Sequence, residues 1–168
     1  MTIETLIKAA ELDGRLIRFV PRTRNPPQRR AFCSFRMIDE IRNPNSALNV
    51  LQGAGHVTAA ITRWVAGDVI YKGFVKRLKP PPPDVWEIRV TWPSPQWRIF
   101  GCFAAQDTLV LSHYRSRGAL GQFGSREWSA AMSECAAHWA GLFGSAPCYR
   151  NGDRSIGYVT GKCDDFKI

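Results

Sequence analysis

The order of hydrophobic and polar positions predicts a helix and a strand at the start of the chain. Apolar side chains recur three and four positions apart over residues 3–12, which predicts an amphipathic helix that Thr2 caps and Gly14 ends. The apolar run at 15–20 is short and predicts a strand. Residues 21–30 read PRTRNPPQRR, without an apolar side chain, so we expect an exposed basic loop there. It is either a flexible connector or an arm that contacts phosphate or an acidic protein.

The middle of the chain is patterned less clearly. Residues 32–41 fit a short helix or a strand, and the three-residue spacing of their apolar positions favours the helix. One or two helices are predicted over 47–65, where Gly53 and Gly55 interrupt the apolar pattern. The four consecutive prolines at 80–83 predict an extended, stiff loop, because proline cannot donate to a helix or a sheet.

Clear strand signals begin after these prolines, where residues 85–90 alternate between apolar and polar positions. The three predicted strands cover residues 85–90, 97–103 and 108–114. Short turns join them, so they predict an antiparallel meander. After a glycine-containing loop, apolar residues every three or four positions predict a helix over 126–143. Residues 144–168 are mixed and predict either a strand at 155–160 or a loosely packed tail.

These elements together predict an α+β fold. We expect an antiparallel three- or four-stranded sheet with helices packed on one face, the fourth strand coming from residues 16–20. The predicted division of the chain is a basic N-terminal extension (1–45), an α+β core (46–143) and a C-terminal tail (144–168). A chain of 168 residues is long enough to bury a core without disulfides or metals.

The charge of the chain narrows the classes of partner. There are 23 Lys and Arg against 14 Asp and Glu, a formal net charge of +9. The excess is concentrated, because residues 1–30 hold seven basic and three acidic side chains and residues 72–98 hold six and two. Clustered positive charge favours a polyanionic partner such as nucleic acid or the ribosome, an acidic protein or an anionic membrane surface.

Other features of the sequence exclude several locations and chemistries. No apolar run approaches the ~20 residues that span a bilayer, and the charged residues within 1–12 are unlike a signal peptide, so we expect a cytoplasmic protein without a membrane partner. The five cysteines form no CxxC pair and are expected to be free thiols. Cys135 and His138 are spaced as two helix-borne ligands, but no second pair matches them, so we expect no metal. No phosphate-binding glycine loop and no Gly-x-Ser-x-Gly motif is present.

The predicted meander carries a concentrated set of guanidinium and imidazole groups. Alternation places Arg89 and Arg98 on one sheet face near a turn, and His113 and Arg115 stand at the end of the third strand. Such a set suits RNA cleavage, in which arginines stabilise charge on the phosphate and a histidine moves protons. The alternative is an ordinary solvated face of an antiparallel sheet.

Four segments of the sequence resemble the RelE/HigB-type toxin superfamily, and most of all its HigB-like, phage-associated branch. They are Lys76-Arg77-Leu78-Lys79, Val85-Trp86-Glu87-Ile88-Arg89-Val90, Trp97-Arg98-Ile99-Phe100, and Leu109-Val110-Leu111-Ser112-His113-Tyr114-Arg115. With the following predicted helix, the resemblance covers about residues 72–143. Members of this superfamily are typically ribosome-dependent mRNA endonucleases that an antitoxin neutralises. The long N-terminal region and the four prolines depart from the family pattern.

The resemblance implies a RelE-like core and a metal-independent endoribonuclease toxin without a cofactor, acting on mRNA, with the ribosome and an antitoxin as partners. The residues it implies for catalysis are His113, Arg98 and Arg115. The residues expected to bind RNA are Arg89, Arg117, Tyr114, Lys76, Lys79 and Trp97. The alternative hypothesis is a non-catalytic phage or mobile-element protein that binds nucleic acid or a nucleoprotein complex as an inhibitor or regulator.

Overall fold

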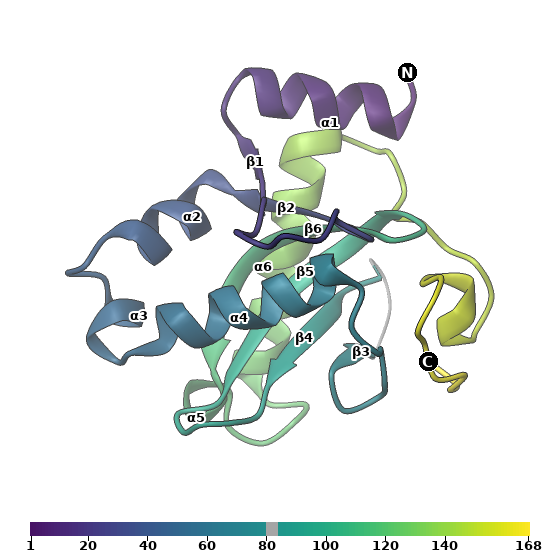
Figure 1. Cartoon of the computed structure of the whole chain (residues 1–168). Helices are drawn as coiled ribbons and strands as arrows, with labels where there is room; N and C mark the ends of the chain where they lie inside the picture. Colours follow the sequence, from purple (N-terminus) through teal and green to yellow (C-terminus); the bar gives the residue numbers. More distant parts are fainter. Residues whose placement is uncertain (80–83) are drawn as a thin grey trace.

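The fold is organised around one six-stranded mixed sheet (Figure 1). The computed structural model describes residues 1–79 and 84–168, so the loop predicted at the four prolines lies outside the described residues. The strands are β1 (Leu16–Arg18), β2 (Arg30–Ser34), β3 (Val75–Arg77), β4 (Trp86–Val90), β5 (Trp97–Ala105) and β6 (Thr108–Ser116). Their order in the sheet is β1-β2-β6-β5-β4-β3. The β2–β6 pair is parallel, and the other neighbouring pairs are antiparallel.

Helices cover both faces of this sheet. They are α1 (Ile3–Leu12), α2 (Phe35–Arg42), α3 (Ala47–Val50), α4 (Gly53–Ala66), α5 (Arg117–Leu120), α6 (Arg126–Phe143) and the 3-10 turn η1 (Ser155–Gly157). In Figure 1, α4 lies in front of the sheet and α6 behind it. Two apolar cores result: α2, α3, α4 and the C-terminal residues share one, and α1, α5 and α6 share the other.

The expected sheet architecture is therefore wrong in two respects, while the α+β class is confirmed. The sheet is mixed and has six strands, and helices pack on both of its faces. Burial of β5 shows why, because Ile99 on the α4 side and Phe100 on the α6 side are both fully buried. A sheet that carries apolar side chains on both faces must be covered twice to keep them from water.

The predicted meander is confirmed as β4–β5–β6. Trp86 and Ile88 pack into the core on the α4 side, so Glu87 and Arg89 face the α6 side, as alternation predicted. Pairing aligns Arg89 with Arg98 and Arg98 with Arg115 across the three strands.

The N-terminal residues belong to the same sheet as the meander. The segment 32–41 is divided between the two predicted structures, because β2 ends at Ser34 and α2 begins directly after it. The prediction that 21–30 is exposed throughout is wrong at its end, where Arg29 is 3% exposed. The guanidinium of Arg29 donates to the carbonyl oxygens of Trp64, Asp68, Thr160 and Lys162, which joins the end of α4 to the C-terminal segment.

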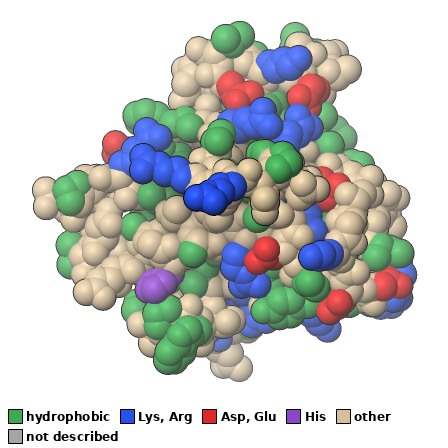
Figure 2. Space-filling model, in the orientation of Figure 1, with side chains coloured by type: hydrophobic (Ala, Val, Ile, Leu, Met, Phe, Trp, Pro, Cys, Tyr) green, Lys and Arg blue, Asp and Glu red, His purple; other side chains and the backbone are tan. Residues whose placement is uncertain are grey.

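The C-terminal segment is anchored to the core by a few buried side chains. Tyr158 is fully buried and contacts the rings of Trp86 and Phe103, with ring centroids 4.8 Å and 5.3 Å away. The predicted strand at 155–160 is not formed; η1 occupies its first half. No helix among the described residues is long and apolar enough to cross a membrane. Figure 2 shows Lys and Arg side chains gathered over β1 and β2, between α1 and α4.

Candidate active site

A β-bulge near the end of β6 determines which side chains reach the α6 face. Gly101 pairs with Leu111 and Phe100 pairs with His113, so Ser112 is left over as the bulged residue. Side chains alternate along a strand, and the extra residue therefore turns His113 to the same side as Phe100. Without the bulge, His113 would point to the α4 side.

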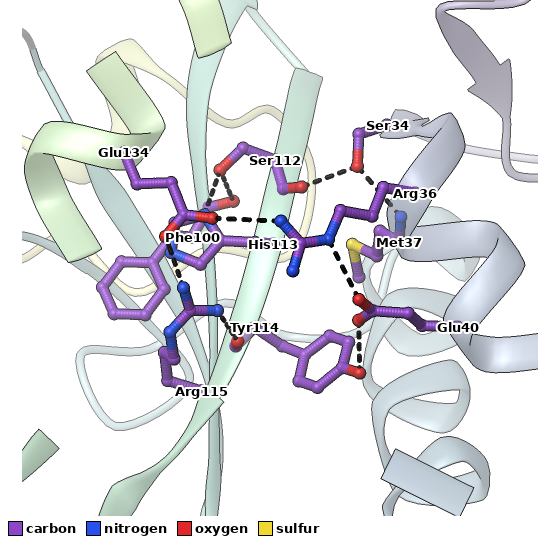
Figure 3. A network of polar contacts seen from close by, with 10 residues as sticks. All are labelled: Ser34, Arg36, Met37, Glu40, Phe100, Ser112, His113, Tyr114, Arg115 and Glu134. Atoms are coloured by element: carbon purple, nitrogen blue, oxygen red, sulfur yellow. Dashed lines mark hydrogen bonds and ion pairs between the residues drawn. The ribbon is translucent and has the colours of Figure 1, made fainter. Parts of the chain in front are cut away.

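The imidazole of His113 is held by a ring stack and one hydrogen bond (Figure 3). Its ring stacks on Phe100 with centroids 4.9 Å apart and an interplanar angle of 12°. Its Nδ1 lies 2.7 Å from Ser112 Oγ, and that hydroxyl donates its own proton to the Phe100 carbonyl oxygen at 3.3 Å. When this hydroxyl gives its only proton to Phe100, Ser112 Oγ accepts from Nδ1–H of His113. In that tautomer the neutral imidazole has its lone pair on Nε2.

The other ring nitrogen of His113, Nε2, lies near a carboxylate. It is buried, has no hydrogen-bond partner among the described residues and lies 3.9 Å from Glu134 Oε2. Burial, together with the positive charges of Arg115, His138 and Arg36, lowers the pKa of His113 to about 3. His113 is therefore neutral at physiological pH.

Charged side chains from α2, β6 and α6 surround this atom. Arg115 donates to the Glu134 carboxylate, and Arg36 Nη1 lies 4.0 Å from the other oxygen of that carboxylate. Arg36 Nε also donates to Glu40 at 3.0 Å, and the Tyr114 hydroxyl donates to Glu40 at 2.5 Å. Figure 3 shows this as one continuous network from β6 to α2. Burial and the bond to Glu40 raise the pKa of Tyr114.

The network opens into a pocket of about 560 Å³ between α2 and α6. The pocket lies where the parallel strands β2 and β6 end, which is a common place for ligand sites in sheets with parallel strands. Ser34 fixes this end, because its hydroxyl donates to the Ser112 carbonyl oxygen at 2.6 Å and accepts from Met37 N–H at the start of α2. His113, Arg115, Arg36, Glu134 and His138 are among the lining residues.

Arg98, one of the three predicted catalytic residues, does not reach the pocket. Its side chain is buried at 2% exposure, and its Nε lies 3.4 Å from the carboxylate of Glu87, which is equally buried. Burial raises the pKa of Glu87 against the opposing influence of Arg98 and Arg89. Arg98 and Glu87 thus form a buried ion pair under α6, and the alternative of a solvated face is wrong at this position.

The residues predicted to bind RNA are divided among three places. Trp97 is buried on the α4 side, where its ring meets that of Tyr114 edge to face at 5.6 Å. Arg117 caps the loop after α5 by donating to the Gly121 carbonyl oxygen, and Arg89 lies 3.5 Å from Glu87. The remaining two, Lys76 and Lys79, lie at a separate groove beside β3.

The cysteines are free thiols, as predicted. Four of the five are buried, and Cys102 Sγ lies 3.9 Å from Cys135 Sγ between β5 and α6. Cys135 therefore contacts another thiol while His138, one turn further along α6, lines the pocket. Within residues 1–79 and 84–168, no group of three or more side chains has the geometry of a metal site.

Sequence reasoning missed Arg36 and Glu134, which complete the pocket, and gave Ser112 no role. Arg36 stands at the second position of a helix whose start was misplaced, and Glu134 lies on α6, 19 residues from its partner Arg115. No spacing rule links residues on such different elements.

The fold has a helix–sheet–helix architecture, with a pocket lined by charged and imidazole side chains at the end of its parallel strands. Comparisons with family models, curated proteins and solved structures gave no match. The resemblance to RelE/HigB-type toxins consequently rests on the sequence motifs alone.

Proposed function

We propose that this protein is an endoribonuclease that cuts RNA in the pocket around His113. The observation that carries this proposal is the convergence of a neutral imidazole, a second histidine and three arginines, among them Arg36 and Arg115, on one pocket. Cleavage by attack of a ribose 2′-oxygen on the neighbouring phosphate requires these groups: a proton acceptor, stabilisation of charge on phosphorus and a proton donor for the leaving 5′-oxygen.

Each group has an assignable step. His113 Nε2 accepts the proton of the 2′-hydroxyl, because Ser112 holds the tautomer with its lone pair on that atom. Arg115 and Arg36 bind the phosphate oxygens, which replace the Glu134 carboxylate that lies against both in the free protein. His138, whose Nε2 is also buried without a hydrogen-bond partner in the described part of the chain, donates a proton to the leaving oxygen.

The phosphate itself supports the acid role of His138. Burial lowers the pKa of His138 in the free protein. An anion bound between the arginines opposes their field and stabilises the protonated imidazole, so substrate binding raises the pKa of both histidines.

The biological setting follows from the sequence resemblance. We propose that the RNA is mRNA, that the ribosome presents it, and that a cognate antitoxin protein inhibits the enzyme. The proposed chemistry uses side chains of the chain itself.

A labelled single-stranded RNA tests this directly. The purified protein should produce fragments ending in a 2′,3′-cyclic phosphate, and expression should arrest growth until a neighbouring small gene is co-expressed. His113→Gln should abolish both effects. Intact RNA after incubation, both alone and with translating ribosomes, contradicts the proposal.

A second candidate function is RNA binding without cleavage. The pairing of Arg115 with Glu134 favours this function, because a carboxylate that stays on Arg115 keeps that guanidinium from a phosphate in the pocket. RNA would then be bound elsewhere on the protein and would not be cut. Tight binding of RNA that remains uncut would support this function.

A further inference from the structure

A second groove lies at the β3 edge of the sheet and shares no lining residue with the pocket around His113. Its volume is about 300 Å³. Three segments that are distant in the sequence form it: β3 with its flanking residues, the loop between α5 and α6, and the C-terminal residues. The lining residues are Lys72, Lys76, Arg77, Lys79, Phe123, Phe166, Lys167 and Ile168.

Most of the basic side chains of the groove form no ion pair within the described parts of the chain. Five of its lining side chains are basic and none is acidic. Only Arg77 has a carboxylate partner among the described residues, the buried Asp84. In the pocket around His113, by contrast, Arg36 and Arg115 already lie against Glu40 and Glu134. Of these two sites, the groove therefore has the charge that is available to an incoming polyanion, and its low-dielectric walls strengthen the field.

An aromatic ring stands beside these charges. Phe123 is 47% exposed, and Lys76 Nζ lies 5.1 Å from its ring centroid. The same ring meets Trp128 edge to face at 5.2 Å, which holds it in place against α6. A fixed ring next to uncompensated lysines combines a stacking surface for a base with ligands for the adjoining phosphate.

The C-terminal wall of the groove is held rigidly. Phe166 N–H donates to Ser155 Oγ at 3.0 Å, and Ile168 N–H donates to the Asp153 carbonyl oxygen at 2.9 Å. On the opposite wall, the Asp84 carboxylate fixes Arg77. A ligand would meet a site that needs little ordering on binding, which favours affinity.

We propose that this groove binds the phosphate backbone of single-stranded RNA with one base stacked on Phe123. The choice of RNA as the polyanion rests on the proposed function. The groove gives the protein a binding site separate from the pocket in which the RNA is cut, so binding and cleavage are separable by substitution.

Binding is measured by fluorescence anisotropy with a labelled, 2′-O-methylated oligouridylate of about 12 nucleotides, which lacks the attacking hydroxyl and remains uncut. The groove variant is Lys72→Glu with Lys167→Glu, both exposed side chains. The matched control is Lys8→Glu with Arg24→Glu, which changes net charge equally near the opposite edge of the sheet. We expect the groove variant to bind about 10-fold or more weakly, with little change in the control. The slope of log affinity against log salt concentration should become shallower by about 1.4, because two phosphate contacts contribute about 0.7 each on a single strand.

The Phe123→Ala variant distinguishes base stacking from phosphate binding. It should weaken oligonucleotide binding about 10-fold and leave binding of inorganic polyphosphate unchanged, because polyphosphate has no base to stack. Equal affinities of the groove and control variants for the oligonucleotide overturn the proposal. The proposal is also overturned if the groove variant binds phosphatidylserine vesicles more weakly but binds the oligonucleotide as well as the wild-type protein does. A further outcome is that the protein binds the oligonucleotide through the groove and still leaves unmodified RNA uncut. That result supports RNA binding in the groove and overturns only the proposed cleavage.

Discussion

Arg98 and Arg115 face each other as paired residues of β5 and β6, yet their guanidinium groups bind different carboxylates. Arg98 contacts Glu87 in the buried layer under α6, and Arg115 contacts Glu134 at the mouth of the pocket. One arginine therefore belongs to the fold and the other to the site.

Substitution of each arginine should separate these roles. Arg98→Ala leaves the Glu87 carboxylate buried without its nearest cation and should lower the free energy of unfolding by about 3–5 kcal/mol. Arg115→Ala removes a pair that is about one-third exposed and should cost less than about 1 kcal/mol. Urea denaturation measures both. Equal stability of the two variants would contradict the assignment, and Arg98→Met with Glu87→Met should recover most of the loss.

The catalytic assignment predicts a graded effect at Ser112 and His113. His113→Gln removes the proton acceptor and should lower the cleavage rate by about 10²–10⁴-fold. Ser112→Ala keeps the ring stack but releases the Nδ1 proton, so the rate should fall less. Cleavage assays give the rates, and ¹⁵N NMR of the imidazole reports the tautomer. An Nε2–H tautomer in the unsubstituted protein would contradict the assignment.

The low pKa of His113 makes stability depend on pH. The folded-state pKa of about 3 lies below the unfolded value near 6.5, so the unfolded chain binds a proton first as pH falls. The contribution of His113 to stability is therefore full above pH 6.5 and is lost as pH falls from 6.5 towards 3. As the pH falls from 6.5 to 4, the free energy of unfolding of the wild-type protein should decrease by up to about 3 kcal/mol more than that of His113→Gln. Parallel pH profiles of the two proteins in urea denaturation would contradict the burial of this ring.

Arg29 should behave as a structural residue although it lies in a basic loop. Arg29→Met leaves four carbonyl oxygens without their donor and should lower the free energy of unfolding by roughly 3 kcal/mol. Hydrogen exchange of residues 155–168 should accelerate, since these residues lose their link to α4. Arg22→Met, at an exposed position of the same loop, should change stability by less than about 0.5 kcal/mol.

The bulge predicts a special requirement at Gly101. A Cβ atom there would lie 2.5 Å from the Val110 carbonyl oxygen, so the backbone of β6 must shift. Gly101→Ala should cost about 1–3 kcal/mol and displace His113 from its stack on Phe100. Gly118→Ala, where no atom lies within 4 Å of the added Cβ, is the matched control and should be neutral or stabilising. Thermal unfolding and the His113 ring signals in NMR measure both effects.

Local sequence patterns predicted the elements whose formation depends on side-chain periodicity and helix capping. Alternation in β4, the apolar runs of β5 and β6 and the apolar stripe of α6 were sufficient to place those elements. N-cap serines such as Ser125 marked helix starts. The parallel β2–β6 pair was missed because parallel strands pair across a long connection, here from Ser34 to Thr108, and leave no short-range turn signal. The presence of helices on both faces was missed for a related reason. The amphipathic pattern of α1 shows that one of its sides is buried, but it does not show which face of the sheet that side packs against.

The sequence by itself determined the meander, its amphipathic helices and the clustering of positive charge near β3. Only the tertiary structure decided which of the basic residues are buried, because burial depends on the element that covers each face. It also placed Ser112 in a bulge and thereby turned His113 towards Glu134, a side-chain direction that a regular strand would reverse. The candidate site therefore depends on one unpaired residue, which the alternation of apolar and polar positions does not reveal.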